Sequence, residues 1–259
     1  MTVHHIGLDP RYAQAFKAVG IDLRERIDRA QQIAERRRYL GASEAAAALG
    51  RAYHRRRVPS GQVIYSNDQK AKTFAIIVSG VVKLTNVSPD GRQQIVGLQF
   101  PSDFVGRPFS GKSNLLAEAA SDLDLCCFSG DVFENLMRRH TEIETVVLKR
   151  TLDSLDSARE WMFMLGRKTA QERVASLIYM IAERLTPPGA EPRAMTGPCR
   201  FECPLSRTEM ADCLGLRLET VSRQIANLIA EGVLSKSRSR TFEVRDMAEL
   251  RRIAETPAD

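Results

Sequence analysis

The chain lacks the segments that direct a protein into or across a membrane. It has 259 residues and no apolar run near the roughly 20 residues that span a bilayer. Its N-terminus, MTVHHIGLDPRYAQAF, contains no basic segment followed by an apolar core, which a secretory signal requires. We therefore expect a cytoplasmic protein with no membrane contact, whose five cysteines are reduced.

The sequence also lacks the constellations that mark an enzyme. We find no paired carboxylates for general acid–base work, no nucleophile–base pair and no phosphate-binding loop. Cys199 and Cys203 are four residues apart but have no second pair of ligands, so they do not predict a zinc site. We therefore predict that the protein is not an enzyme and that it holds no metal ion.

Positive charge is scarce where a DNA-binding surface would need it. The net charge is +6, but residues 1–57 hold 12 Lys and Arg against 6 Asp and Glu, while residues 58–185 and 186–259 are each balanced. The excess lies in an Arg- and Ala-rich N-terminal extension over residues 1–57, which we interpret as helical or partly disordered. A DNA-binding function must therefore depend on where individual cations lie.

Short strands occupy the middle of the chain. From Val58 onwards, segments such as FAIIVSGVVKLTNV and RQQIVGLQF are rich in β-branched residues and bounded by turns. Pro89, Asp90 and Gly91 separate two of these segments, as the turn of a hairpin does. We predict a β-sandwich or β-roll over residues 58–130.

A long helical pattern follows, which predicts one helix over residues 131–165. Some of its residues recur at the a and d positions of a heptad, as in a two-stranded coiled coil. This seam consists of Leu148, Thr151, Leu155, Ala158, Met162 and Leu165. The spacing favours a homodimer, and the alternative is a helix that packs on its own domain. Gly166 interrupts the pattern, so we assign residues 166–259 to a separate C-terminal module.

The C-terminal module contains helix–turn–helix spacing in LSRTEMADCLGLRLETVSRQIANL. Ser206 and Glu209 form the S-x-x-E capping box that begins a helix at Arg207. Gly215 can adopt the left-handed conformation of a sharp helix end, and a second helix begins near Leu218. The alternative is an ordinary helical hairpin with no nucleic-acid partner.

The outer face of the second helix is polar. Arg223 lies four residues after Glu219, so the two side chains share a face. Arg suits the O6 and N7 acceptors of guanine, and Glu accepts from the amino group of cytosine. This pattern predicts that the helix reads bases in double-stranded DNA. The alternative is a plain surface ion pair between Glu219 and Arg223.

Several further polar residues are placed to contact the DNA backbone. Thr208, Arg217 and Thr220 are suited to hold phosphates, which fix register but carry no sequence information. The segment EGVLSKSRSRTFEV, residues 231–244, is typical of a short hairpin that serves as a wing. The cations at its tip are Lys236, Arg238 and Arg240.

The motif LSRTEMADCLGLRLETVSRQI, followed by a wing and preceded by a β-roll and a long helix, resembles the Crp/Fnr superfamily of bacterial transcription regulators. The resemblance runs from about Gly61 to Ala254 and is greatest to the alphaproteobacterial Fnr/FixK branch. The segments that carry it are GRQQIVGLQFPSDFVGRPF (91–109), DLDLCCF (122–128), REWMFMLGRKTAQERVAS (159–176) and ETVSRQI (219–225). It implies an α+β fold with an N-terminal cyclic-nucleotide-binding-like β jelly roll, a long dimerisation helix and a C-terminal winged helix-turn-helix.

The resemblance also implies a function. In this branch the residues that match Glu219, Ser222 and Arg223 read a TTGA-type half-site, which a homodimer meets twice in a palindrome. The resemblance further implies a transcription activator that works with RNA polymerase and controls low-oxygen or nitrogen-oxide metabolism.

The iron–sulfur cluster of the oxygen-sensing members does not fit this sequence. Those members hold a [4Fe–4S] cluster with three closely spaced N-terminal cysteines and one further cysteine in the β-roll. Cys126 matches the further cysteine, but residues 1–125 contain none, and a cubane needs four ligands. We therefore expect that the usual cluster cannot form.

Cyclic AMP and haem are two other signals to which such a regulator could respond. Residues 102–120 have no Glu at the turn and no Arg-Ser/Thr pair that would bind a cyclic nucleotide, so we do not expect cAMP. Haem stays open, because some gas sensors of this branch lack cluster cysteines. The available imidazoles, none with a diagnostic spacing, are His4, His5, His54 and His140.

A thiol switch is the last candidate signal. Cys213 lies in the first helix of the reading unit near its turn, where oxidation would add bulk and polarity; the alternative is a small buried residue. With no ligand site visible, we predict control through the amount of protein. The alternative is a haem- or ligand-responsive gas or redox sensor of the same fold.

Overall fold

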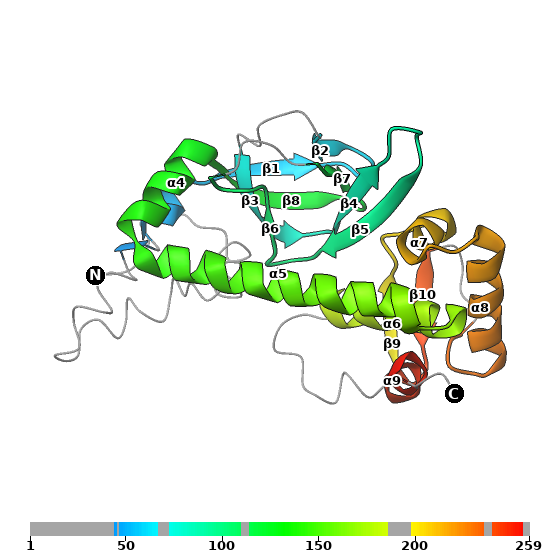
Figure 1. Cartoon of the computed structure of the whole chain (residues 1–259). Helices are drawn as coiled ribbons and strands as arrows, with labels where there is room; N and C mark the ends of the chain where they lie inside the picture. Colours follow the sequence, from blue (N-terminus) through cyan, green and yellow to red (C-terminus); the bar gives the residue numbers. More distant parts are fainter. Residues whose placement is uncertain are drawn as a thin grey trace, which may run out of the picture. The chain divides into compact units, whose positions relative to one another are not determined.

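The computed structural model describes residues 44–45, 47–66, 73–109, 114–185, 198–235 and 240–255 (Figure 1). The described residues fall into two compact units. The first comprises those up to Leu84 together with Gln99–Leu155, and the second comprises Thr85–Leu98 together with those from Asp156 onwards. Residues 1–43, which make up most of the predicted N-terminal extension, lie outside the described residues.

Two four-stranded sheets form the β-roll. One sheet is antiparallel and has the order β1 (His54–Val58), β8 (Leu123–Ser129), β3 (Thr73–Ser79) and β6 (Phe104–Val105). The other has the order β2 (Val63–Tyr65), β7 (Leu116–Ala119), β4 (Val82–Val87) and β5 (Gln93–Gln99). The β-roll expected from the sequence is therefore confirmed. The hairpin turn at Asp90 is present as well, with Gly91 at φ 83° between β4 and β5.

Residues 125–128 of strand β8 are covered on both faces, which explains why these four consecutive residues are apolar. Successive side chains of a strand point to opposite sides. Leu125 and Cys127 belong to a core that both sheets build, whereas Cys126 and Phe128 belong to a second core on the outer side of the first sheet. A strand buried on both faces needs apolar residues at every position rather than at alternate ones.

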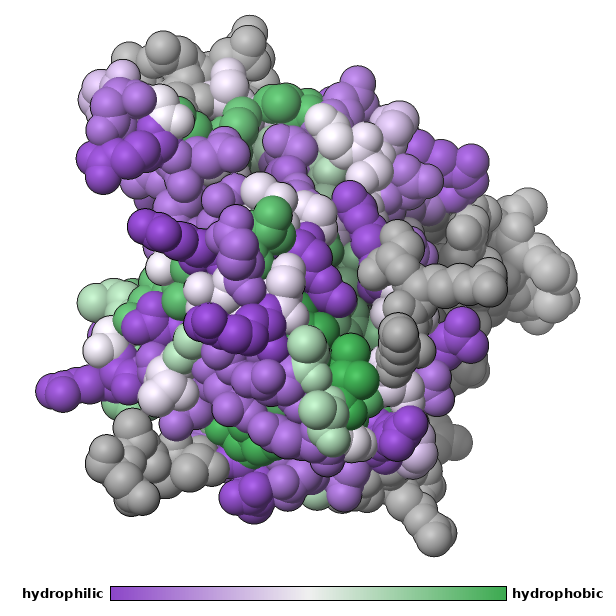
Figure 2. All heavy atoms as spheres, turned by 90° about the vertical axis from the view of Figure 1, so that its right-hand side faces the viewer, coloured by the Kyte–Doolittle hydropathy of each residue, from purple (hydrophilic) through white to green (hydrophobic). Residues whose placement is uncertain are grey.

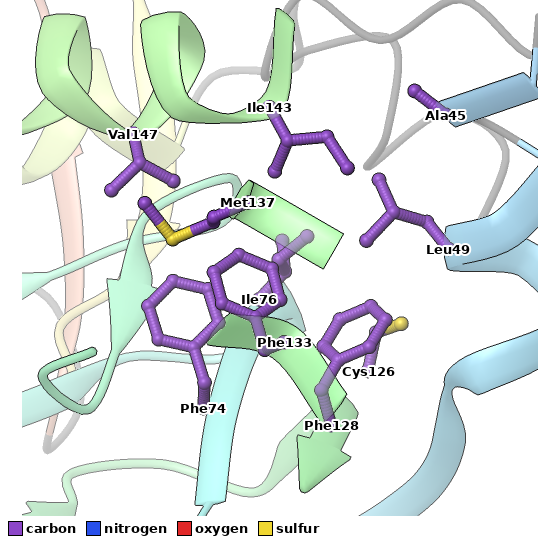
Figure 3. Close-up of a cluster of buried hydrophobic side chains, with 10 residues drawn as sticks. All are labelled: Ala45, Leu49, Phe74, Ile76, Cys126, Phe128, Phe133, Met137, Ile143 and Val147. Atoms are coloured by element: carbon purple, nitrogen blue, oxygen red, sulfur yellow. The ribbon is translucent and has the colours of Figure 1, made fainter. Parts of the chain in front are cut away.

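The second core, which we call the outer cluster, joins the sheet to helix α4 (Gly130–Arg139) (Figure 3). The rings of Phe74 and Phe133 stack with centroids 3.9 Å apart. Leu49, from the helical residues 47–52, closes the cluster on another side. The complete set is Ala45, Leu49, Phe74, Ile76, Cys126, Phe128, Phe133, Met137, Ile143 and Val147.

The single helix predicted over residues 131–165 is in fact two helices. Helix α4 ends at Arg139, His140 is extended with φ −130° and ψ 97°, and helix α5 runs from Thr141 to Arg167. Both helices bury residues in the outer cluster, and the bend at His140 lets each do so. The predicted end of the long helix near Gly166 agrees with the structure to within two residues, because α5 ends at Arg167 and α6 begins at Ala170.

The predicted helical character of residues 43–57 holds only in part. Residues 44–45 and 47–52 are helical, but His54–Val58 form strand β1. Pairing with β8 outweighs the local sequence, and the guanidinium of Arg55 donates to both carboxylate oxygens of Asp124 at 2.9 and 2.6 Å. The first sheet therefore begins four residues before the predicted boundary at Val58.

The second unit is built around helix α6 (Ala170–Leu185), which packs against α8 (Leu218–Ala230) and α9 (Met247–Glu255). The remaining elements are α7 (Arg207–Leu214) and an antiparallel pair of strands, β9 (Cys199–Glu202) and β10 (Thr241–Val244). No helix in the described part of the chain is both long and apolar enough to cross a membrane.

Candidate nucleic-acid interface

Helix α7 begins with the predicted capping box. The hydroxyl of Ser206 accepts a hydrogen bond from the backbone N–H of Glu209 at 3.2 Å, and the carboxylate of Glu209 accepts from the backbone N–H of Ser206 at 2.8 Å. These bonds satisfy two N–H groups that a helix start leaves unpaired. The start of α7 at Arg207 is thereby confirmed.

The turn between the two helices depends on Gly215. Its backbone has φ 61° and ψ 36°, the left-handed conformation that favours glycine. Its N–H donates to the carbonyl oxygen of Ala211, as does the N–H of Leu216 at 3.1 Å. The predicted role of Gly215 as the end of α7 is confirmed, and α8 begins three residues later.

Helix α8 separates an apolar inner face from a polar outer face. Val221, Ile225 and Leu228 are buried, at the spacing of one helical face. Glu219, Ser222, Arg223 and Ala226 are exposed on the other side. The surface of the protein on this side is predominantly hydrophilic, with smaller hydrophobic areas between (Figure 2).

Glu219 and Arg223 lie one helical turn apart on α8. In the described part of the chain no ion pair joins them. The alternative of a plain surface ion pair is thus not what the structure has. A carboxylate and a guanidinium are left side by side, each able to bond an external partner.

An exposed leucine at the start of α8 is a feature that the sequence analysis missed. Leu218 is the first residue of the helix and its side chain is 42% exposed. It lies directly before Glu219, at the end of the helix that enters a groove in helix–turn–helix proteins. The sequence did offer a sign of it, because Leu218 is an apolar residue that does not belong to the buried set of Val221, Ile225 and Leu228.

The residues predicted to hold the DNA backbone are spread over three elements. Thr208 is exposed on α7, Arg217 is the exposed residue before α8, and Thr220 is half-buried. Arg240 is exposed just before β10, and its carbonyl oxygen accepts from the N–H of Cys203 at 2.8 Å. Lys236 and Arg238 lie outside the described residues.

The base of the predicted wing is a small sheet. Leu234 bridges to Val244 of β10, and the N–H of Ser235 donates to the carbonyl oxygen of Glu243 at 2.8 Å. Arg207 of α7 lies over the ring of Phe242 at 4.7 Å, and burial lowers the pKa of its guanidinium. A cation over an aromatic face therefore joins the wing strand to the first helix of the motif.

Helix α5 exposes an apolar stripe. Ile143 and Val147 are buried in the outer cluster, whereas Leu148, Leu155 and Met162 of the predicted seam are 59%, 45% and 73% exposed. The other seam positions, Thr151 and Ala158, are exposed, and Leu165 is half-buried. Leu152, which the heptad pattern did not include, is 53% exposed and extends the stripe.

Four of the five cysteines are buried, and Cys199 is half-buried. Cys126 and Cys127 are buried, and burial raises the pKa of Cys126 far above that of a free thiol and the pKa of Cys127 to about 11. A metal cluster needs thiolates, which these surroundings disfavour. Cys213 is also buried, in the core of the helix–turn–helix. Within the described ranges no three His, Cys, Asp or Glu side chains converge as metal ligands would.

The described histidines lie on different elements. His54 is exposed on β1 and His140 is half-buried between α4 and α5, while His4 and His5 lie outside the described residues. In the stretch considered for a cyclic nucleotide, the carboxylate of Glu118 pairs with the ammonium of Lys83 at 2.7 Å.

Comparisons with known proteins agree with this arrangement. Residues 55–140 match the cyclic nucleotide-binding domain family, and residues 172–253 match the Crp-like helix-turn-helix domain family. The transcriptional activator protein FnrL of Cereibacter sphaeroides is 43% identical over 208 residues, which are 80% of this chain and 83% of that protein. The nitrogen fixation regulation protein FixK of Bradyrhizobium diazoefficiens is 33% identical over 188 residues, 72% of this chain and 75% of that protein.

A solved structure shares the fold as well. The structure of FixK2 from Bradyrhizobium japonicum has a TM-score of 0.70 to this chain at 29% identity. The match covers 80% of this chain and 99% of that one.

Proposed function

Because the chain belongs to the Crp/Fnr family of DNA-binding transcription regulators, which are not enzymes, we propose that it reads a TTGA-type palindrome as a homodimer. We further propose that it activates genes of low-oxygen or nitrogen-oxide metabolism in the cytoplasm, together with RNA polymerase. The observation that carries the proposal is the exposed row of Glu219, Ser222 and Arg223 on α8.

The side chains of this row have the chemistry that base edges require. A guanidinium can donate two hydrogen bonds to guanine, and a carboxylate accepts from the amino group of cytosine. Guanine and cytosine pair with each other, so Arg223 and Glu219 suit a G·C base pair such as the one in TTGA. Leu218 adds an apolar contact for the 5-methyl group of a neighbouring thymine.

The surrounding residues would set the register of α8 in the major groove. Thr208, Arg217 and Thr220 lie at the start of the two helices, where side chains reach phosphates. Arg240 and the cations Lys236 and Arg238 would add contacts from the wing. Such contacts strengthen binding to every sequence and make it depend on salt.

The apolar stripe of α5 supports the dimer. Regulators of this family bind DNA as dimers. Leu148, Leu155 and Met162 are too exposed to contribute to the fold of one chain, whereas a second copy of the helix would bury them. Two copies then present two reading helices, which is why a palindrome is the matching site.

The proposed control does not use the family's iron–sulfur cluster. The usual N-terminal ligands are absent from residues 1–125, and Cys126 is packed among apolar side chains. Cyclic AMP is not proposed either, because the sequence lacks the phosphate-binding pair. We propose that the amount of the protein sets its activity. Cys213 would need local opening of the helix–turn–helix before it could react, since it is buried.

A gel-shift experiment tests the proposed reading of DNA. We expect Arg223→Ala to lose the preference for a TTGA-type palindrome over a scrambled duplex, a change of about 10- to 100-fold for one bidentate contact. Arg251→Ala is the matched control, because it removes the same charge from an exposed residue of α9. An unchanged preference in Arg223→Ala would show that the assignment is wrong. Genome-wide footprinting under aerobic and anaerobic growth then identifies the controlled genes.

A further inference from the structure

The first turn of α6 contacts the ends of several other helices of the second unit. This turn, Ala170–Arg173, directly follows the junction between α5 and α6 at residues 168–169. Its polar side chains, those of Gln171, Glu172 and Arg173, bond groups outside α6. None of them lies on the surface proposed to read bases.

Arg173 bridges two helix ends with two different nitrogen atoms. Its Nε donates to the carbonyl oxygen of Lys168 at 2.8 Å, and its Nη1 donates to the carbonyl oxygen of Leu214 at 3.2 Å. Lys168 is the first residue beyond α5, and Leu214 is the last residue of α7. Carbonyl groups at the C-terminal end of a helix lack partners within the helix and carry partial negative charge, so they suit a cation.

Gln171 bonds the residue at the C-terminal end of the reading helix. Its Nε2 donates to both carboxylate oxygens of Glu231 at 3.0 Å, and Glu231 is the C-cap that directly follows α8. Arg173 thus holds α7 immediately before the Gly215 turn, and Gln171 holds α8 at its end. The two helices of the motif are attached to one turn of α6.

The junction itself is closed by further bonds. The carboxylate of Glu172 accepts from the backbone N–H of Thr169 at 2.8 Å. The ammonium of Lys168 donates to the hydroxyl of Ser176 at 2.8 Å, and that hydroxyl donates to the carbonyl oxygen of Ala254 in α9 at 3.4 Å. The backbone between α5 and α6 is therefore not a free hinge in this structure.

We propose that Arg173 is a positioning residue that sets the geometry between the end of α5 and the reading helix α8. The inference rests on the proposed function, in which α5 joins two copies and each α8 reads a half-site. If Arg173 fixes α7 and α8 to the end of α5, the dimer presents its two reading helices at one separation. The residue then determines which spacing between half-sites the protein accepts, without touching DNA.

The experiment measures tolerance to half-site spacing. One inserted base pair moves a half-site by about 3.4 Å along the duplex and rotates it by about 35°. Affinities are measured by fluorescence anisotropy for a TTGA-type palindrome, the same palindrome with one base pair added or removed, a single half-site and a scrambled duplex. The readout is the ratio of affinities between the matched and the altered spacing, which a general loss of stability does not change.

Arg173→Lys and Arg173→Ala are the test variants. Lysine keeps the charge but has one nitrogen, so it cannot repeat the two bonds from separate atoms. We expect the wild type to lose at least about tenfold in affinity when the spacing changes, and each variant to lose less than about threefold, since a charged hydrogen bond accounts for roughly a tenfold change. Gln171→Glu places a carboxylate against Glu231 and should shift the ratio in the same direction.

Arg252→Ala is the control, because it removes an exposed arginine of α9 that bonds Glu249 one turn away. Sedimentation velocity and thermal unfolding show which variants are folded dimers, and Arg173→Lys decides if Arg173→Ala does not fold. A folded Arg173→Lys dimer with the spacing ratio of the wild type overturns the inference. The inference is also overturned if a variant loses affinity equally for the single half-site and for the palindrome, because Arg173 would then support α8 alone. A wild type that does not distinguish the palindrome from the scrambled duplex overturns the proposed function instead.

Discussion

Helices α5 and α8 each leave one face uncovered by the chain, but the two faces have opposite chemistry. On α8 the exposed residues are polar and the buried residues apolar, as expected for a helix at a water-facing surface. On α5 the stripe of Leu148, Leu152 and Leu155 is both apolar and exposed. Helix α8 therefore has the amphipathic pattern of a helix within one chain, whereas the exposed apolar stripe of α5 fits the proposed pairing with a second copy.

The largest expected effect is on the exposed face of α5. We expect Leu155→Asp to yield monomers and to lower the affinity for the palindrome by about 100-fold, because a charge would be buried without a partner in the dimer. Sedimentation velocity and gel shifts measure the two quantities. Ser154→Asp, with the same charge on an exposed neighbour, should leave both near the wild type. A dimeric Leu155→Asp protein would remove the contrast between α5 and α8.

A smaller effect distinguishes a residue that stabilises the helix–turn–helix from a residue that is proposed to contact DNA. We expect Ser206→Ala to lower the free energy of unfolding by about 1 kcal/mol, because the hydroxyl caps α7. Ser222→Ala should leave the unfolding free energy unchanged, since this exposed residue of α8 is proposed to act only on DNA. Urea unfolding followed by circular dichroism measures both variants. Equal losses of stability would contradict the division of roles.

The smallest expected effect concerns Leu218 at the start of α8. We expect Leu218→Ala to weaken binding to the TTGA-type palindrome by about threefold, the magnitude of one lost apolar contact. Replacing the thymines of the site by uracil removes the methyl groups and should weaken the wild type equally. Anisotropy titrations of both proteins on both duplexes form a double-mutant cycle. If the two losses add without coupling, Leu218 does not contact a thymine methyl group.

The elements that were predicted well are those that local chemistry specifies. The capping box at Ser206, the glycine turn at Gly215 and the polar face of α8 each depend on residues within one or two turns of each other. The hairpin at Asp90 is local in the same sense. For such elements the neighbouring residues in the sequence are also the neighbours in space.

The elements that were predicted wrongly depend on distant partners. Residues 54–57 form a strand because β8, about 70 residues away, pairs with them and Asp124 bonds Arg55. The break at His140 reflects two helices packing on one cluster.

Motif spacing and amphipathic periodicity depend on consecutive residues, so the sequence was enough to predict the family, the two-part fold and the polar outer face of α8. The folded chain was needed to show which apolar residues stay exposed, such as Leu152 and Leu218, and which polar residues join distant elements. Arg173 is an example: it bonds the carbonyl oxygen of Lys168, five residues before it, but its other partner, Leu214, is 41 residues away and meets it only when α6 and α7 pack together. Hydrogen bonds between helix ends depend on distances in space, which spacing along the chain does not specify.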